Sequence, residues 1–206
     1  MSLPPLAQVS DVTARLPSSV SVETTRVAAL LTDASAVVRN FTRQQFTTAQ
    51  TTDKIRPIGY RLRLPQKPVV SVDSLALLLF NSATPYPFPG WWWDGSDEVW
   101  LVTGDQLINL AEEAVGFLEW QSPVCLVTYT HGYDMSPDDV VGVVCSMVIR
   151  TLTAPGLGGV VSEGVGEYNY RLSDAAAQGS MALTVAEQQI LKPYRPRKSA
   201  TAELRW

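Results

Sequence analysis

The chain has 206 residues, of which 46% are hydrophobic and 17% charged, and its formal net charge is −4. This length suffices for one large core or two packed subdomains. No apolar run approaches the roughly 20 residues that cross a bilayer, so we expect no membrane span, and we expect no signal peptide. With two cysteines and one histidine, neither a disulfide framework nor a structural zinc site is expected, and we predict no metal and no cofactor.

The first quarter of the sequence predicts two helices. A short helix is expected at 11–16, ended by Pro17. A long helix begins after Ser21, which can cap it, and runs to about Phe46. Its apolar residues recur with the three-and-four spacing of one helical stripe; they are Val27, Leu30, Leu31, Ala34, Val37, Val38 and Phe41. This stripe is core within one subunit or a packing face in a bundle.

From 51 to 130 the pattern changes to strands. Short runs with β-branched and aromatic residues, separated by turn residues, predict a small antiparallel sheet or barrel. The runs lie at 60–64, 69–72, 74–80, 98–102, 116–120 and 124–129. The segment 81–90 holds three prolines and is predicted to be a loop. We expect this β region to be an insertion between the long helix and the next helix.

Three adjacent tryptophans, Trp91, Trp92 and Trp93, follow the proline-rich segment. Side chains alternate faces along an extended chain, so the three cannot all face one core, and at least one is predicted to be exposed. Exposed tryptophans anchor protein interfaces or stack on sugars, while inward ones would cap the β insert. We assign the three to a subunit interface, with a carbohydrate-binding β module as the alternative function.

The C-terminal third predicts a second helical region. Ser136, Pro137 and Asp138 are typical of a helix start, and a helix at 137–153 is apolar on nearly every side, which predicts burial all round. A glycine-rich stretch and a hairpin near 168–172 follow. Thr184 and Glu187 predict a capping box for a short last helix.

The final segment, 192–206, is basic and is interrupted by two prolines. Nonspecific phosphate contact is one interpretation of its charge. Because such a segment resists folding alone, we expect it to become ordered when it docks on another protein. The predicted docking residues are Lys192, Tyr194, Arg195, Arg197, Lys198, Arg205 and Trp206.

Charge is segregated along the chain. Residues 1–67 hold nine basic and four acidic residues, residues 68–149 hold eleven acidic and no basic residues, and residues 150–206 hold seven basic and five acidic residues. An acidic block between basic flanks can pair within one subunit, or across a head-to-tail interface between subunits. For the second arrangement, the predicted basic interface residues are Lys54, Arg56, Arg61, Arg63 and Lys67.

The search for catalytic chemistry finds little. His131 is the only histidine, and it lies in a predicted glycine turn, where a turn-stabilising or interface role is expected. Glu112 and Glu113 are adjacent, so on a strand their carboxylates would point to opposite faces. Phosphate-loop and nucleophile-elbow motifs are absent. We predict that the protein is not an enzyme, with a small hydrolase using these residues as a rival class.

Several segments together resemble the head-to-tail adaptor (connector) proteins of tailed bacteriophages that infect actinobacteria. The main one is the strand, glycine turn and helix start from Val127 to Val140. The others are Val9-Ser-Asp-Val-Thr-Ala-Arg-Leu16, Leu30-Leu-Thr-Asp-Ala-Ser35, Arg63-Leu-Pro-Gln-Lys-Pro-Val69, Trp93-Asp-Gly95 and Leu183-Thr-Val-Ala-Glu187. The resemblance spans nearly the whole chain. The segment 81–93 is richer in proline and tryptophan than expected for such proteins, which leaves the role of the insert open.

The sequence patterns and the resemblance together give an α+β fold. It has a helical core, made of the long amphipathic helix and the buried helix, an inserted small antiparallel β-sheet or barrel, and an extended C-terminal tail. The expected divisions are N-terminal helices at 1–50, the β insert at 51–130, C-terminal helices at 131–191 and the docking tail at 192–206.

The resemblance also implies a function. It implies a structural virion protein that forms a ring, dodecameric in such proteins, between the portal protein and the next tail-side connector (stopper) protein. The C-terminal segment would dock on the portal. Packaged DNA would pass through the lumen without sequence-specific binding. The expected location is the virion neck, after assembly in the host cytoplasm.

Overall fold

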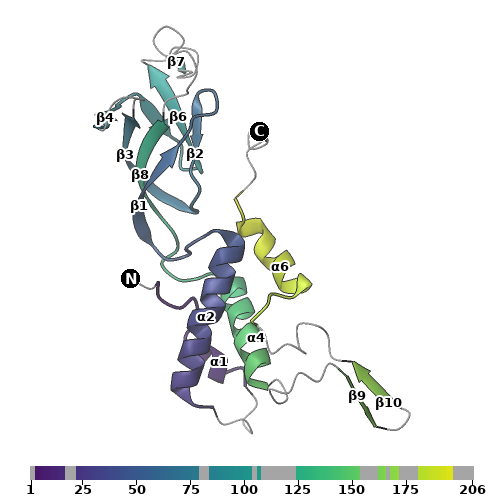
Figure 1. Ribbon diagram of the computed structural model, residues 1–206. Coiled ribbons are helices and arrows are strands. Elements are labelled where there is room, and N and C mark those ends of the chain that lie inside the picture. Colours follow the sequence, from purple (N-terminus) through teal and green to yellow (C-terminus); the bar gives the residue numbers. More distant parts are fainter. Residues whose placement is uncertain are drawn as a thin grey trace. The chain divides into compact units, whose positions relative to one another are not determined.

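The computed structural model describes residues 3–16, 22–78, 84–103, 106–107, 124–153, 162–165, 168–171 and 181–196. These residues form an α+β fold with α-helices and short antiparallel strands (Figure 1). The helices are α1 (Val9–Thr13), α2 (Thr24–Thr42), α4 (Asp138–Thr153) and α6 (Val185–Leu191), and a 3₁₀ turn follows at Lys192–Tyr194. The strands are β1 (Ala49–Ile55), β2 (Arg61–Arg63), β3 (Val69–Leu78), β4 (Tyr86–Pro87), β5 (Trp91–Trp93), β6 (Glu98–Thr103), β7 (Gln106–Leu107), β8 (Val124–His131), β9 (Ser162–Val165) and β10 (Tyr168–Arg171).

The chain divides into two compact units. The first, here called the helical unit, combines Met1–Gln45 with Met135–Trp206. The second, the strand unit, is Phe46–Asp134. The strand unit is thus inserted in the chain between α2 and α4. The boundaries fall a few residues from the divisions at 50/51 and 130/131 that the sequence suggests.

The helical unit is built on the packing of α2 against α4, with α1 and α6 in contact with both. The predicted stripe of α2 is buried at Val27, Leu31, Ala34 and Val38. A fully buried valine or leucine contributes about 1.5–3 kcal/mol relative to an exposed one. The buried residues of α4 are Val140, Val143, Val144, Cys145, Met147 and Val148. Burial all round is wrong in detail, because α4 exposes Ser146 and its acidic first turn.

Local chemistry sets the helix ends. α2 ends at Thr42 and not near Phe46, because Arg43 adopts a left-handed backbone (φ 60°) and its N–H bonds the Arg39 carbonyl at 2.7 Å. The cap residue of α2 is Glu23; the predicted cap Ser21 lies outside the described residues. The predicted capping box of α6 is present, with Thr184 and Glu187 each bonding the other's backbone N–H.

The strand unit contains two antiparallel sheets. One has the order β1-β8-β3-β4, and the other has the order β2-β6-β5 with β7 also paired to β6. Both sheets are open among the described strands, so the barrel alternative is not supported there. β1 was not singled out from the sequence, and β5 forms a strand with the three tryptophans. The strand predicted at 116–120 lies outside the described residues.

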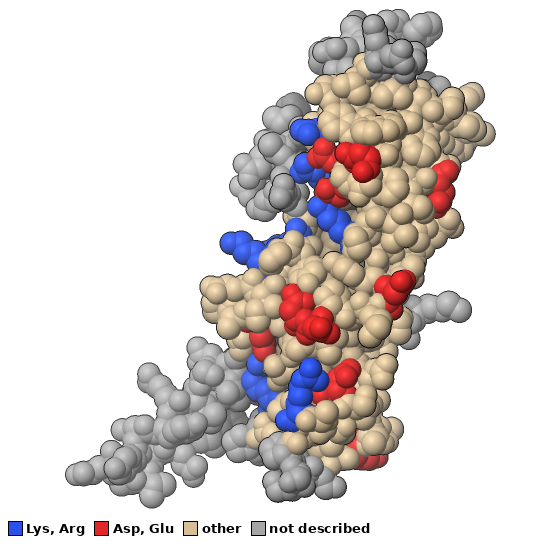
Figure 2. Space-filling model, turned by 180° about the vertical axis from the view of Figure 1, so that it is seen from behind, with Lys and Arg blue, Asp and Glu red and all other residues tan. Residues whose placement is uncertain are grey.

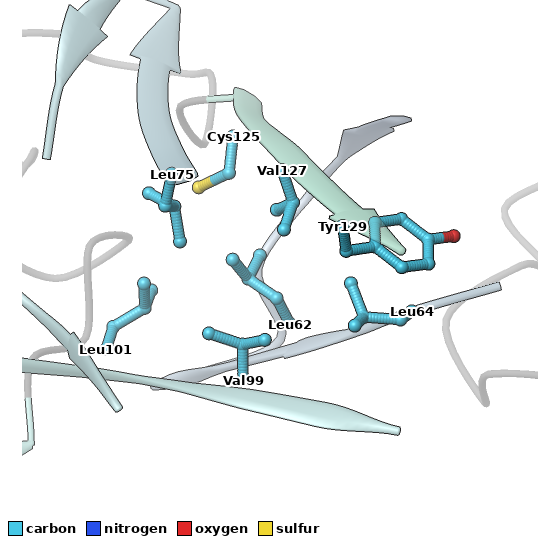
Figure 3. Close-up of a cluster of buried hydrophobic side chains, with 8 residues drawn as sticks. All are labelled: Leu62, Leu64, Leu75, Val99, Leu101, Cys125, Val127 and Tyr129. Atoms are coloured by element: carbon cyan, nitrogen blue, oxygen red, sulfur yellow. The ribbon is translucent and has the colours of Figure 1, made fainter. Parts of the chain in front are cut away.

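The core of the strand unit lies between the two sheets. Figure 3 shows its buried side chains pointing toward one another, from β2, the residue after it and β6 on one side and from β3 and β8 on the other. They are Leu62, Leu64, Leu75, Val99, Leu101, Cys125, Val127 and Tyr129. β8 follows strict alternation, with Cys125, Val127, Tyr129 and His131 inward. This core fixes which side chains of each strand point outward.

Candidate interaction surfaces

The three adjacent tryptophans point in alternate directions, as the sequence predicts. Trp91 and Trp93 pack against the core of the strand unit. Trp93 also donates its Nε1–H to the Ser96 carbonyl at 2.7 Å. Trp92, between them, is 55% exposed. Trp91 and Trp93 therefore cap the core of the strand unit, while Trp92 is the exposed member of the three.

Trp92 belongs to a row of aromatic side chains on the outer face of its sheet. It lies directly opposite Trp100 of β6 in the strand register, so their side chains share one face. Trp100 stacks on Tyr60, with ring centroids 5.5 Å apart and an interplanar angle of 20°. Tyr60 is itself 42% exposed. We call Tyr60, Trp100 and Trp92 the aromatic row.

Sequence reasoning found only one member of the aromatic row. Tyr60 and Trp100 are separated by about forty positions in the chain, and only the pairing of β2 and β5 with β6 brings the three rings together. The available signal was alternation, because Trp100 occupies the outward position between the buried residues Val99 and Leu101. Without the strand order, alternation does not show which aromatic residues lie beside Trp100.

Three of the five basic residues predicted at an interface pair with the acidic block inside the subunit. Arg61 and Arg63 bind Glu98 at 3.3 Å and 2.5 Å, and Lys67 binds Asp97. The hydrogen bonds with Glu98 raise the pKa of Arg63. Burial works to raise the pKa of Asp97, but Lys67 outweighs it and the pKa is lowered. Exposed pairs add about 0–1 kcal/mol each, so they mainly neutralise charge.

The other two basic residues, Lys54 and Arg56, are exposed and have no ion pair among the described residues. Figure 2 shows basic and acidic atoms side by side on part of the surface, next to broad areas without charge. The charge segregation along the sequence is therefore partly cancelled in space. A role of these five residues between subunits stays a prediction.

The described part of the predicted docking tail contacts its own subunit. Lys192–Tyr194 form the 3₁₀ turn after α6. The Tyr194 hydroxyl donates to Asp139 at 2.7 Å, and the Arg195 guanidinium lies 5.0 Å from the centre of the Phe41 ring. The remaining predicted docking residues, Arg197, Lys198, Arg205 and Trp206, lie outside the described residues.

Of the residues named for the hydrolase alternative, the structure describes His131. His131 is the last residue of β8 and is fully buried, 5.5 Å from the Tyr129 ring, and not in an exposed turn. Glu112 and Glu113 lie outside the described residues. Among the residues described, no group of three or more His, Cys, Asp or Glu side chains is placed to hold a metal ion. No described helix is both long and apolar enough to span a bilayer.

Chains of a gene transfer agent particle have this fold. One, in the neck of the empty particle solved with C6 symmetry, matches 98% of this chain over 95% of its own length, with a TM-score of 0.58 and 13% identity. The chain shares its fold with gene transfer agent neck chains. A chain in the native neck, solved with C12 symmetry, matches 97% of this chain over 92% of its own, with a TM-score of 0.51 and 16% identity.

A third match is a chain in the virion of the native gene transfer agent particle. The match covers 95% of this chain and 92% of the virion chain, with a TM-score of 0.53 and 14% identity. No protein-family model matches the sequence, and no curated protein matches it. These matches show a shared fold. The predicted link to phages of actinobacteria is not addressed by these matches.

Proposed function

We propose that this chain is a structural neck protein of a phage-like particle, acting as a head-to-tail adaptor between the portal protein and the next tail-side connector, the stopper. The observation that carries this proposal is the fold, which matches gene transfer agent neck chains over nearly the full length of both partners. A carbohydrate-binding module or small hydrolase with a different fold would not be expected to match these neck chains over the whole length of the chain.

The adaptor would work as a ring. Neck assemblies solved with C6 and C12 symmetry contain the similar chains, which fits the dodecamer that the sequence resemblance implies. A closed ring needs two different complementary patches on each subunit, because every contact is head-to-tail. The outward aromatic row and the exposed basic residues Lys54 and Arg56 are suited to such contacts, although neither has a demonstrated partner.

The proposed lumen lets packaged DNA pass without being held. Tight phosphate binding needs several uncompensated Lys or Arg side chains. In the strand unit, Glu98 and Asp97 offset two of the three positive charges of Arg61, Arg63 and Lys67, and the whole chain is acidic, with a net charge of −4. The adaptor would require no cofactor and catalyse no reaction, and it would reside in the virion neck after assembly in the host cytoplasm.

The test is reconstitution with the portal protein from the same particle. We expect the purified full chain to co-elute with the portal in size exclusion, and electron microscopy to show an added ring at one end of the portal. The matched control is a chain that ends at Pro196, which keeps every described contact of the last helix. A full chain that never joins the portal, at any ratio or salt concentration, would contradict the proposal.

A carbohydrate-binding function is the second candidate, and the outward aromatic row favours it because aromatic faces stack on sugars. Its test is a titration of the full chain with soluble glycans, read by tryptophan fluorescence. A saturable change that disappears in Trp92→Ala, without any portal binding, would replace the adaptor function with this one.

A further inference from the structure

A proline-rich segment of the strand unit is held outward by its neighbours. Residues 84–87 are exposed, and Tyr86 is 55% exposed. Phe88 is the anchor: its N–H bonds the Leu75 carbonyl at 2.9 Å, and its ring packs on the core. β4 pairs with β3 only at Tyr86 and Pro87. Prolines at 85, 87 and 89 favour an extended, already ordered backbone that loses little entropy when it binds.

The aromatic row offers the complementary surface. Flat aromatic side chains are what proline-rich segments dock against in known recognition modes. The charges are compatible as well: residues 84–90 contain no ionisable side chain except the Tyr86 phenol. Glu98 binds both arginines beside the row and offsets one of their two positive charges. An uncharged segment can cover this row without leaving a buried charge unpaired.

The two surfaces lie on different sheets of the strand unit. β4 is the edge strand of one sheet, and the aromatic row is on the outer face of the other. Two unlike, complementary patches on one compact unit are what a head-to-tail contact requires, since one patch of each subunit meets the other patch of the next subunit. The chain thus carries both halves of a repeating interface.

We infer that residues 84–87 of each subunit dock on the aromatic row of the neighbouring copy, with Tyr86, Pro85 and Pro87 seated against Trp92, Trp100 and Tyr60. This inference rests on the proposed ring. Trp92 is the central contact, because it is the most exposed member of the row and tryptophans in such positions dominate binding.

The first experiment does not need a ring. A fluorescently labelled peptide of residues 84–90 is titrated with the full chain up to millimolar concentration, and binding is read by anisotropy. We expect saturable binding that Trp92→Ala weakens about tenfold or more, and that a peptide with all three prolines replaced by alanine loses. Val185→Ala is the control, because Val185 is 73% exposed in the helical unit. Equal binding by Trp92→Ala, or displacement of the peptide by a glycan alone, would overturn the inference.

The second experiment uses assembled necks. Thr84→Cys and Asp94→Cys are introduced together or separately, and a short bismaleimide links nearby thiols. Both positions are exposed and lie two residues from Tyr86 and Trp92, which stay in place. The native cysteines do not compete, since both are buried and burial raises the pKa of Cys125 to about 12. We expect a ladder up to the closed ring for the double variant, a single dimer for mixed single variants and no product for either alone. A homodimer formed by Asp94→Cys alone would overturn the inference.

The two experiments separate the two proposals. Peptide binding without any neck ring would refute the adaptor function and keep the docking contact. A normal ring in which the double variant gives no ladder would keep the adaptor function and refute the docking contact.

Discussion

His131 is a buried histidine without a hydrogen bond from either ring nitrogen to any described residue. Its backbone pairs with both neighbouring strands, opposite Ala49 on one side and Val69 on the other, and its side chain is fully buried. Burial lowers the pKa of His131, and the nearby Asp53 carboxylate opposes this only in part. The ring is therefore neutral in the folded protein at neutral pH.

This burial predicts that acid destabilises the strand unit. The unfolded chain takes up a proton at His131 near pH 6.5, whereas the folded chain does so only at lower pH. The free energy of unfolding should be constant above pH 6.5 and should fall as the pH drops below that value. Urea denaturation between pH 5 and 8, followed by tryptophan fluorescence, measures it. In His131→Leu, the free energy of unfolding should no longer depend on pH over this range. An unchanged pH dependence would assign the effect to other titratable groups.

Tyr129 supplies the only hydroxyl of the core cluster. It donates to Asp53 at 2.6 Å and accepts from the Gln66 N–H at 3.3 Å. Burial and Asp53 both raise the pKa of Tyr129, so the phenol stays protonated and acts as the donor. The pair connects β1, β8 and the segment after β2.

We predict that Tyr129→Phe lowers the free energy of unfolding by about 1–3 kcal/mol, because it removes the hydroxyl that binds the partly buried Asp53 carboxylate and the Gln66 N–H. The comparison is Thr52→Val, which removes the exposed 2.8 Å hydrogen bond between Thr52 and Thr128. That variant should cost less than about 0.5 kcal/mol. Chemical denaturation of both variants at pH 7.5 tests the difference, and similar losses would contradict a special role for the buried pair.

At the scale of elements, the turn after β8 depends on one glycine. Gly132 has a left-handed backbone (φ 104°), and a Cβ at this position would overlap the backbone of Thr47. The close approach lets Thr47 pair with Tyr133 and lets Phe46 stack on the Tyr133 ring at 6.3 Å. The two ends of the strand unit are joined at this point.

Gly132→Ala should therefore prevent normal folding of the strand unit, through both steric overlap and the left-handed backbone. Gly142 is the matched control, because it lies within α4 and a Cβ there would meet nothing within 4 Å. Gly142→Ala should raise stability by about 0.5–1 kcal/mol, since alanine favours the helix. Soluble yield and thermal melts of the two variants measure this contrast. A well-folded Gly132→Ala protein would show that the turn can rearrange.

The elements that could be predicted from sequence are those with a local signal. α4, β8 and the α6 capping box each have a period or a cap within a few residues. β1 was missed because Ala49–Ile55 is mostly polar, and its strand form depends on pairing with β8. The sequence pattern extends α2 too far, because no glycine marks the left-handed Arg43. The aromatic row and the choice of Glu98 as arginine partner both depend on strand order, which no local pattern encodes.

At the scale of the whole molecule, the C-terminal tail has two parts with different expected roles. Residues up to Pro196 are attached to the helical unit through Tyr194 and Arg195, which contact Asp139 and Phe41. The segment 197–206 carries three of the predicted docking basic residues. A chain ending at Pro196 should melt like the full chain and should fail to attach to the portal.

A chain ending at Leu191 should lose about 1–2 kcal/mol of stability in addition, because the hydrogen bond to Asp139 and the contact with Phe41 are removed. Thermal melts and co-elution with the portal separate the two effects. Portal attachment by the chain that ends at Pro196 would show that the docking residues lie elsewhere.

The insertion of one unit within the other also orders events during synthesis. α2 leaves the ribosome before the whole of Phe46–Asp134. Its apolar stripe therefore lacks its α4 partner for the time needed to synthesise that segment, on the order of ten seconds. The strand unit is continuous in the chain and can fold during that interval. Once Thr47 pairs with Tyr133, the loop between α2 and α4 shortens from nearly the whole insert to a few residues, which lowers the entropic cost of closing it. Folding of the strand unit would thus bring α4 close to α2 soon after α4 is synthesised, and so promote the packing of the two helices.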